Sequence, residues 1–378
     1  MPRLALLLGL FWSVSASAQV VLRPVLPLAT DPEISTDLNP HAVAIDLGAD
    51  RADVLYVHLV GSCGTPAANL EIMRHAAALG LHAVSLTYPN CPSVGDLAQG
   101  SSDPDVHEQI RTERLYGVDT SPLVTVSRAN SIENRLIRLL QYLDANFPTE
   151  NWAQFLDTGA PRWSRIIVGG HSQGSGHAGL LTKHHALHGA LFFGGPGDGF
   201  AGGDVAPWVF QPSVTSAANM VGFTHRNDSL FARATATYDA FELDAFPPMV
   251  NVDAVAPPFR DSHQFTSFAE PGRPGEFHGC VVVDVNLARL PDGTPLYAPV
   301  WTQMFEIALS QPGDTIGDMN CDGVTSVGDI SGFVLALTNA NAYAVAWPNC
   351  NIQRGDINAD SVVTVGDIAG FVELLTNP

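Results

Sequence analysis

Five consecutive residues in this sequence could place a nucleophile for acyl transfer. Residues 170–174 read Gly-His-Ser-Gln-Gly, with a glycine two positions before and two positions after Ser172. This pattern is typical of a sharp turn from a strand into a helix, which exposes a serine hydroxyl at the carboxyl edge of a sheet. An apolar stretch at 165–169 precedes the turn, and small residues follow it. We therefore predict a reactive serine at position 172; the alternative is a glycine-rich turn without one.

Two acidic stretches near the C-terminus could bind calcium. Residues 317–339 and 355–377 are identical at fifteen of 23 positions, so they mark a duplicated unit. Calcium takes oxygen ligands from positions 1, 3, 5, 7, 9 and 12 of a short loop, with a backbone carbonyl at position 7. The pattern predicts two Ca²⁺ ions. The expected ligands are Asp318, Asn320, Asp322, Val324, Ser326 and Asp329 in the first loop, and Asp356, Asn358, Asp360, Val362, Thr364 and Asp367 in the second.

The sequence around Ser172 alternates between strand and helix patterns. Such alternation predicts an α/β fold, in which a mostly parallel sheet has helices on its faces. The segment 89–129 is polar, irregular and too long for a simple connection, so we expect it to be an insertion that caps the site. The expected strands are 40–47, 54–60, 82–88, 165–169, 189–194, 220–224 and 263–268, and the expected helices begin near 66, 131, 173 and 298.

In strand order and in the Gly-His-Ser-Gln-Gly turn, residues 40–309 resemble the α/β-hydrolase superfamily. The resemblance implies the α/β-hydrolase fold and a serine esterase or lipase-like activity. It also implies a nucleophile, an acid and a histidine in that chain order, with no cofactor for catalysis.

The resemblance implies which residues complete the catalytic set. The acid follows the seventh strand, where Asp228 stands, and Asp198 after the sixth strand is the alternative. The histidine lies between the last strand and the last helix, which matches His278, with His263 as the alternative. The three groups are needed together, because a serine hydroxyl becomes nucleophilic only when a histidine, oriented by a carboxylate, accepts its proton.

An oxyanion hole needs two backbone N–H groups aimed at the developing negative oxygen. One is expected from Gln173, the residue after the nucleophile. The other is expected from the loop after the strand at 54–60, where Ser62 is the first choice and Cys63 the second. An ordinary glycine turn is the alternative for this loop.

Five cysteines leave at least one thiol without an intramolecular partner. Cys321 and Cys350 share the C-terminal region and are expected to pair, as are Cys63 and Cys91, which follow two successive strands. Cys280 is then left over. The alternative is five reduced cysteines.

The C-terminal repeats resemble type I dockerin domains over residues 314–378. The resemblance implies a small all-α calcium-binding module that a cohesin-like or cell-surface partner recognises, often in polysaccharide degradation. Dockerins often carry hydroxyl residues at loop positions 10 and 11. Here Val327-Gly328 and Val365-Gly366 stand at those positions, which argues against a usual cohesin partner.

The ends of the chain and its composition bound the remaining possibilities. Residues 1–18 read as a signal peptide cleaved before Gln19, and no later stretch is long and apolar enough to span a membrane. We expect a hydrolase domain at 19–310, a linker at 311–316 and a dockerin-like domain at 317–378. The net charge of -20 argues against nucleic acid and anionic membrane surfaces as partners.

Together these features predict a secreted serine hydrolase that cleaves a carboxylic ester and is tethered through its calcium-binding tail. Two other classes of function remain open. The hydrolase fold can be a non-catalytic binding or assembly scaffold, or the chain can be a glycoside hydrolase, which needs two opposed carboxylates.

Overall fold

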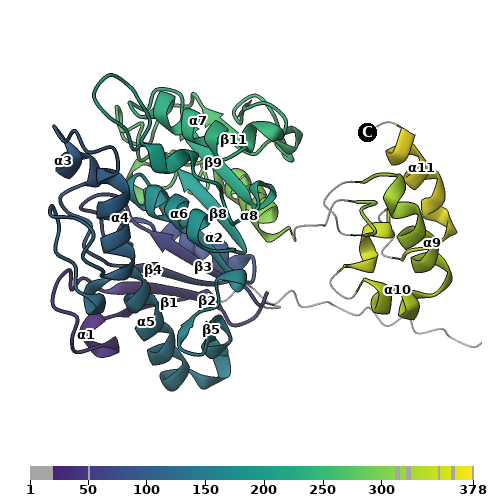
Figure 1. Cartoon of the computed structure of the whole chain (residues 1–378), viewed down its shortest axis with the longest axis horizontal. Coiled ribbons are helices and arrows are strands. Elements are labelled where there is room, and N and C mark those ends of the chain that lie inside the picture. The colour runs from purple at the N-terminus through teal and green to yellow at the C-terminus, as the bar shows by residue number, and fades with distance from the viewer. Residues whose placement is uncertain are drawn as a thin grey trace, which may run out of the picture.

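The computed structural model describes residues 20–49, 52–310, 316–320, 325–347, 350–358 and 362–376. The expected signal peptide and most of the expected linker lie outside these ranges. A nine-stranded sheet organises the larger part of the chain, with the strand order β1-β2-β4-β3-β7-β8-β9-β11-β10 (Figure 1). The strands are β1 (Val20–Val25), β2 (His41–Asp46), β3 (Leu55–Leu59), β4 (His82–Leu86), β7 (Ile166–His171), β8 (Gly189–Phe193), β9 (Met220–His225), β10 (Val250–Asn251) and β11 (Gln264–Ser267).

Most of the sheet is parallel. β1 and β2 pair antiparallel, as do β2 and β4, and every later pair from β3–β4 to β10–β11 is parallel. All residues of β3, β4, β7, β8 and β9 are buried, which explains why these strands read as short continuous apolar runs. A small separate hairpin joins β5 (Leu156–Asp157) to β6 (Ala160–Pro161).

Helices cover both faces of the sheet. One face packs against α5 and α6, where Leu136, Leu140 and Leu180 belong to one hydrophobic cluster. The other face packs against α2 and α8 through a second cluster that includes Met73 and Trp301. The helices of this part are α1 (Pro27–Thr30), α2 (Leu70–Ala78), α3 (Val94–Ala98), α4 (Val106–Tyr116), α5 (Ile132–Asn146), α6 (Gln173–His184), α7 (Phe231–Ala240) and α8 (Ala298–Leu309).

This architecture confirms the predicted α/β fold with a mostly parallel sheet and flanking helices. The expected strands and helices are present, and the Ser131 hydroxyl caps α5 by accepting a hydrogen bond from the N–H of Asn134 (3.3 Å). β1, β10 and α7 were not predicted. β10 is two residues long and α7 begins without a side-chain cap, so neither has a strong local signal.

The segment 89–129 folds as two helices, α3 and α4, that pack on each other through a small cluster including Val94 and Ile110. The loop after α4 is organised by the buried Glu113 carboxylate. It accepts hydrogen bonds from the backbone N–H groups of Thr120, Ser121 and Val126 (3.2, 3.0 and 2.9 Å). The insertion is therefore an ordered wall of the domain with its own internal contacts.

The C-terminal repeats form a separate hydrophobic cluster of Met319, Phe333, Ala336, Tyr343 and Phe371. Phe333 and Phe371 occupy equivalent positions of the two repeats, and their rings stack with centroids 4.0 Å apart. The helices are α9 (Ile330–Thr338), α10 (Ala340–Ala346) and α11 (Ile368–Thr376), of which α10 was not predicted. Figure 1 shows these helices grouped apart from the nine-stranded sheet.

Across the described ranges, the helices are too short or too polar for any of them to cross a bilayer.

Candidate active site

Ser172 lies at the corner between β7 and α6. Its backbone has φ 55° and ψ -115°, a conformation that non-glycine residues rarely adopt and that is often found at functional corners. The two flanking glycines are required by close packing. A Cβ at Gly174 would clash with the carbonyl of Leu59, and one at Gly170 would clash with the backbone of Gly174. The local sequence therefore builds the strained turn that the residue pattern predicted.

Asp228 and His278 form a hydrogen-bonded pair at the same edge of the sheet. His278 Nδ1 lies 2.8 Å from Asp228 Oδ2. Because the carboxylate can only accept, Nδ1 carries the proton and Nε2 is left bare to accept another. The Asp228 side chain is fully buried, whereas 34% of the His278 side chain is exposed.

The environment of Asp228 keeps its carboxyl group ionised. Burial raises its pKa, but the hydrogen bond and the charge of His278, together with the N–H of Leu230, outweigh burial, and the net pKa is lowered. The Leu230 N–H donates to Oδ1 at 2.9 Å. A permanently charged carboxylate stabilises the imidazolium that forms when His278 accepts a proton.

The pair lies next to the turn that carries Ser172. His171 Nε2 donates to the backbone oxygen of His278 (3.0 Å), and the two imidazole rings have centroids 4.8 Å apart. Gly194 lies against the pair, since a Cβ there would lie 3.5 Å from both His278 Cε1 and Asp228 Oδ2, and Ser172 donates its N–H to the backbone oxygen of Phe193 (2.9 Å). Burial and the neighbouring His278 lower the pKa of His171 to about 3, so His171 is neutral near pH 7 and a weaker base than an ordinary imidazole.

The three expected oxyanion donors differ in whether their backbone N–H groups already have a hydrogen-bond acceptor. Cys63 donates its N–H to the backbone oxygen of Asn90 (3.2 Å), which removes Cys63 as a candidate. Gln173 is the first residue of α6, and the first N–H groups of a helix have no partner within it. The N–H of Ser62 has no acceptor among the described residues, and Ser62 lines the same cavity as Ser172. The N–H groups of Gln173 and Ser62 are therefore not used by other described residues, whereas that of Cys63 is.

The side chain of Gln173 ties this corner to the insertion. Its Oε1 accepts from the N–H of Val94 and from Arg114 Nη1 (both 2.8 Å), and its Nε2 donates to the backbone oxygen of Asn90 (2.9 Å). Arg111, from α4, donates to the backbone oxygen of Gln173 (2.8 Å). The partners from the insertion, Val94, Arg111 and Arg114, were not predicted from the sequence, because no local periodicity links α4 to α6.

The alternative acid and base have other partners. Asp198 makes an ion pair with Arg111 (2.5 Å) and accepts from Trp208 Nε1 (2.9 Å), so its partners are an arginine and a tryptophan rather than a histidine. His263 is bonded to the backbone oxygen of Met220 (2.9 Å) and stacks on Phe246, with centroids 3.6 Å apart. Asp198 lines the cavity beside Ser172, but neither Asp198 nor His263 is hydrogen-bonded to His278 or to Ser172.

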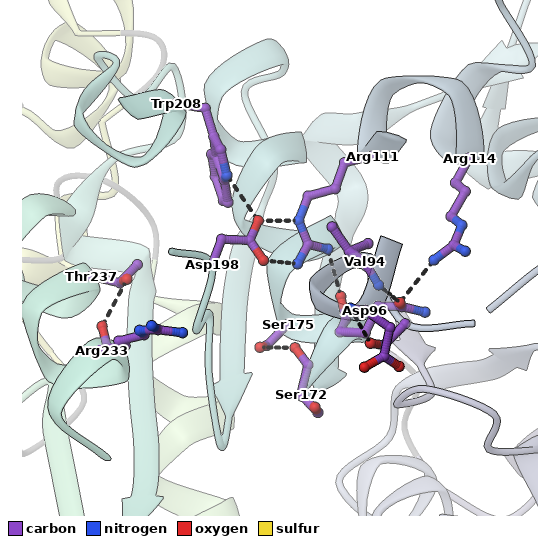
Figure 2. Close-up of polar contacts among 12 residues, drawn as sticks. Val94, Asp96, Arg111, Arg114, Ser172, Ser175, Asp198, Trp208, Arg233 and Thr237 are labelled. Carbon is purple, nitrogen blue, oxygen red and sulfur yellow. Dashed lines mark hydrogen bonds and ion pairs between the residues drawn. The ribbon is translucent and has the colours of Figure 1, made fainter. Parts of the chain in front are cut away.

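A cavity of about 210 Å³ opens beside Ser172. Figure 2 shows Ser172 below the Arg111–Asp198 ion pair, with Arg233 on one side and Asp96 on the other. The lining residues come from the loops after β3 and β8, from α3 and α4, from the turn at Ser172, and from the start of α7. They are Ser62, Ser93, Val94, Gly95, Asp96, His107, Arg111, Ser172, Gln173, Gly197, Asp198, Gly199, Leu230 and Arg233.

The disulfide between Cys63 and Cys91 is present, which confirms that pairing. It joins the loop of Ser62 to the start of the insertion, with the two Cα atoms 4.7 Å apart. Cys280 is a buried free thiol. Burial, followed by the charge of Asp228, raises the pKa of Cys280 to about 12, so it stays protonated. The other expected pair includes Cys321, which lies outside the described residues.

In the C-terminal repeats, the last residue of each expected calcium loop holds the loop backbone together. The buried Asp329 carboxylate accepts three backbone N–H groups of its loop, at 2.8, 3.0 and 2.7 Å. Asp367 does the same with the N–H groups of Asn358 and Thr364 (3.0 and 2.8 Å). The two loops therefore share one design.

Asp318, the first expected ligand, is buried, and its Oδ2 lies 3.4 Å from Arg354 Nη1. Asp322, Val324 and Asp360 lie outside the described residues. Within the described part of the chain, no three His, Cys, Asp or Glu side chains gather as a metal site.

This chain is similar to solved structures, but its sequence matches no known family or curated protein. No protein-family model matches it, and no curated protein matches it. Among solved structures, it is similar to TT1662 from Thermus thermophilus, with 15% sequence identity and a TM-score of 0.41. That similarity covers 78% of this chain and 100% of the other.

Proposed function

We propose that this protein is a secreted serine hydrolase that cleaves carboxylic esters through an acyl-enzyme intermediate. Ser172 is the nucleophile, His278 the general base and Asp228 the acid that orients it. One observation carries the proposal. A hydrogen-bonded Asp–His pair lies beside a serine held at positive φ between a buried strand and a helix N-terminus.

The proposed reaction follows from the tautomer of His278. Its bare Nε2 takes the proton of Ser172 as the hydroxyl oxygen attacks the ester carbonyl. The N–H groups of Gln173 and Ser62 stabilise the negative oxygen of the tetrahedral intermediate. His278 then returns the proton to the leaving alcohol, and a water molecule repeats the sequence to release the acid.

The C-terminal repeats are proposed to be a dockerin-like module that folds around two Ca²⁺ ions and docks the enzyme. The spacing of the acidic residues supports calcium, and so does the matching cap that Asp329 and Asp367 make. Export of the chain, with removal of residues 1–18, suits both a calcium-dependent fold and the Cys63–Cys91 disulfide. A role in polysaccharide degradation is proposed on the dockerin resemblance alone.

The test is labelling with a fluorophosphonate, which reacts with activated serines. The wild type is expected to label, and Ser172→Ala and His278→Ala are expected not to. His184→Ala is a matched control, because this histidine lies outside the cavity and contacts Tyr116. If the folded wild type fails to label, or if Ser172→Ala still labels, the proposed mechanism is wrong.

A further inference from the structure

The cavity beside Ser172 has an uneven distribution of charge. Arg111 and Asp198 neutralise each other, and both Asp198 oxygens are occupied by Arg111, with Trp208 sharing one of them. Arg233, from α7, is different. Among the described residues, its guanidinium makes one hydrogen bond, from Nη2 to the backbone oxygen of Phe200 (2.6 Å), and this acceptor carries no formal charge. Among the described residues, no carboxylate lies within 4 Å of this guanidinium.

His107 lines the same cavity and has unused hydrogen-bonding capacity. Its side chain is 1% exposed, its ring packs edge-on against Phe200 (centroids 5.0 Å apart), and its Nδ1 has no partner among the described residues. Burial lowers its pKa; Asp198 opposes this effect, and the positive charges of Arg111 and Arg233 add to it. The lowered pKa favours the neutral form of His107, whose ring can offer a hydrogen bond at the cavity wall.

Asp96, on the cavity wall, and Arg233 give the two sides of the cavity opposite charges, which would orient a charged substrate. Asp96 is exposed in the first turn of α3, and Figure 2 shows it across the cavity from Arg233, with Ser172 and the Arg111–Asp198 pair between them. An anion bound near Asp96 would be repelled, whereas one near Arg233 would be attracted. A buried or half-buried arginine that lacks a counter-ion is a ready partner for a planar carboxylate, which it can bind through two N–H groups.

We propose that the esters hydrolysed at Ser172 carry a carboxylate near the scissile bond, which Arg233 binds as an ion pair and His107 assists with a hydrogen bond. This inference rests on the proposed hydrolase function and names its substrate class. Arg233 contacts the substrate rather than the reacting atoms, so it governs specificity and not the acyl-transfer step itself.

The test compares matched esters that differ only in charge. One pair places the charge on the acyl side, as a p-nitrophenyl hemiglutarate beside p-nitrophenyl pentanoate. The other places it on the leaving group, as 3-carboxyphenyl acetate beside phenyl acetate. In one of the pairs the wild type should have a kcat/KM at least about tenfold higher for the anionic ester. Raising the salt concentration should reduce that preference in the wild type alone.

Arg233→Gln should abolish the preference by lowering kcat/KM for the anionic ester, and Arg233→Lys should restore part of it. Arg74→Gln, an exposed arginine on α2, removes the same charge away from the cavity and should preserve the preference. A labelled wild type with no preference in either pair would overturn this inference while the hydrolase proposal stands, as would a preference that survives in folded Arg233→Gln. An enzyme that neither labels nor hydrolyses any of the four esters would overturn both.

Discussion

The two regions of this protein differ in how the carboxylates at their candidate sites are bonded. Around the cavity of the α/β domain, Asp198 and Asp228 bond to side chains, namely those of Arg111 and His278. In the C-terminal unit, Asp329 and Asp367 are satisfied by loop N–H groups around a cluster of five buried hydrophobic residues. A domain with large cores on both faces of a sheet can fold without a ligand, whereas a unit this small usually needs a metal or a disulfide.

The two regions also differ in their content of histidine, the side chain that exchanges a proton near neutral pH. All thirteen histidines of the chain lie between positions 41 and 278, and none lies in the C-terminal unit. The proposed function assigns proton transfer to the first region and calcium-dependent folding to the second. Four changes would sharpen or break this division, from the largest expected effect to the smallest.

Ser172→Ala should have the largest effect. Removing the nucleophile should lower kcat for ester hydrolysis by about 10⁶-fold, as expected for a serine that acts as one unit with its base. The substitution removes one half-buried hydroxyl, so the midpoint of thermal unfolding should change little. Steady-state assays and calorimetry on the same preparation would measure both. Turnover that persists in the folded variant would place the chemistry elsewhere.

Asp228→Asn should come second. An amide at this position can donate to His278 Nδ1 and so favour the wrong tautomer, which should lower kcat by about 10⁴-fold. Asp198→Asn is the matched comparison. It breaks the ion pair with Arg111, so it should reduce stability but leave the pH profile of kcat unchanged in shape. If the two variants exchanged these effects, the assignment of the acid would be reversed.

Removal of calcium should affect only the C-terminal unit. At calcium concentrations a thousand times the dissociation constant, binding contributes about 4 kcal/mol per site, which a chelator would take away. Calorimetry with EDTA should lose or shift one transition while ester turnover by the α/β domain is preserved. Re-addition of Ca²⁺ should restore the transition, and Mg²⁺ should do so less well. Joint melting of the two regions on chelation would contradict the division.

Mild acid should lower the stability of the α/β domain and leave that of the C-terminal unit unchanged, with the smallest effect per residue of the four changes. Burial lowers the pKa of His41, His58 and His171 to about 3, whereas unfolded imidazoles titrate near 6.5. Below pH 6.5 the unfolded chain therefore binds more protons, so each residue lowers stability by about 1.4 kcal/mol per pH unit as the pH falls toward 3. Denaturant titrations at pH 7 and pH 5.5 should show the loss in the α/β transition alone.

Local sequence predicted the parts of the site that depend on backbone shape. The turn at Ser172 needs glycines that are visible in five residues, and the strands β3 to β9 are apolar runs bounded by turns. Asp228 and His278 could be named because, in the superfamily that the sequence resembles, the acid and the histidine follow particular strands. The resulting expectation for the pair matches a hydrogen bond in the structure, while its catalytic role remains a prediction.

The residues that sequence patterns missed are those supplied by segments with no periodic signal. His107 and Arg111 lie in the insertion, and Arg233 lies on a helix that begins without a cap. Their place in the cavity depends on contacts between positions far apart in the chain, such as the bond from Arg111 to Gln173. A buried arginine on an amphipathic helix has no local signature that separates it from an exposed one.

The bonds of Gln173 have a consequence for how substrates reach Ser172. Lifting the insertion would leave the amide of Gln173, the N–H of Val94 and the guanidinium of Arg114 without their partners, and each such loss costs about 1–3 kcal/mol. We therefore expect the insertion to stay in place while an ester binds and its products leave. The size of the cavity should then decide which esters reach Ser172, with no opening step.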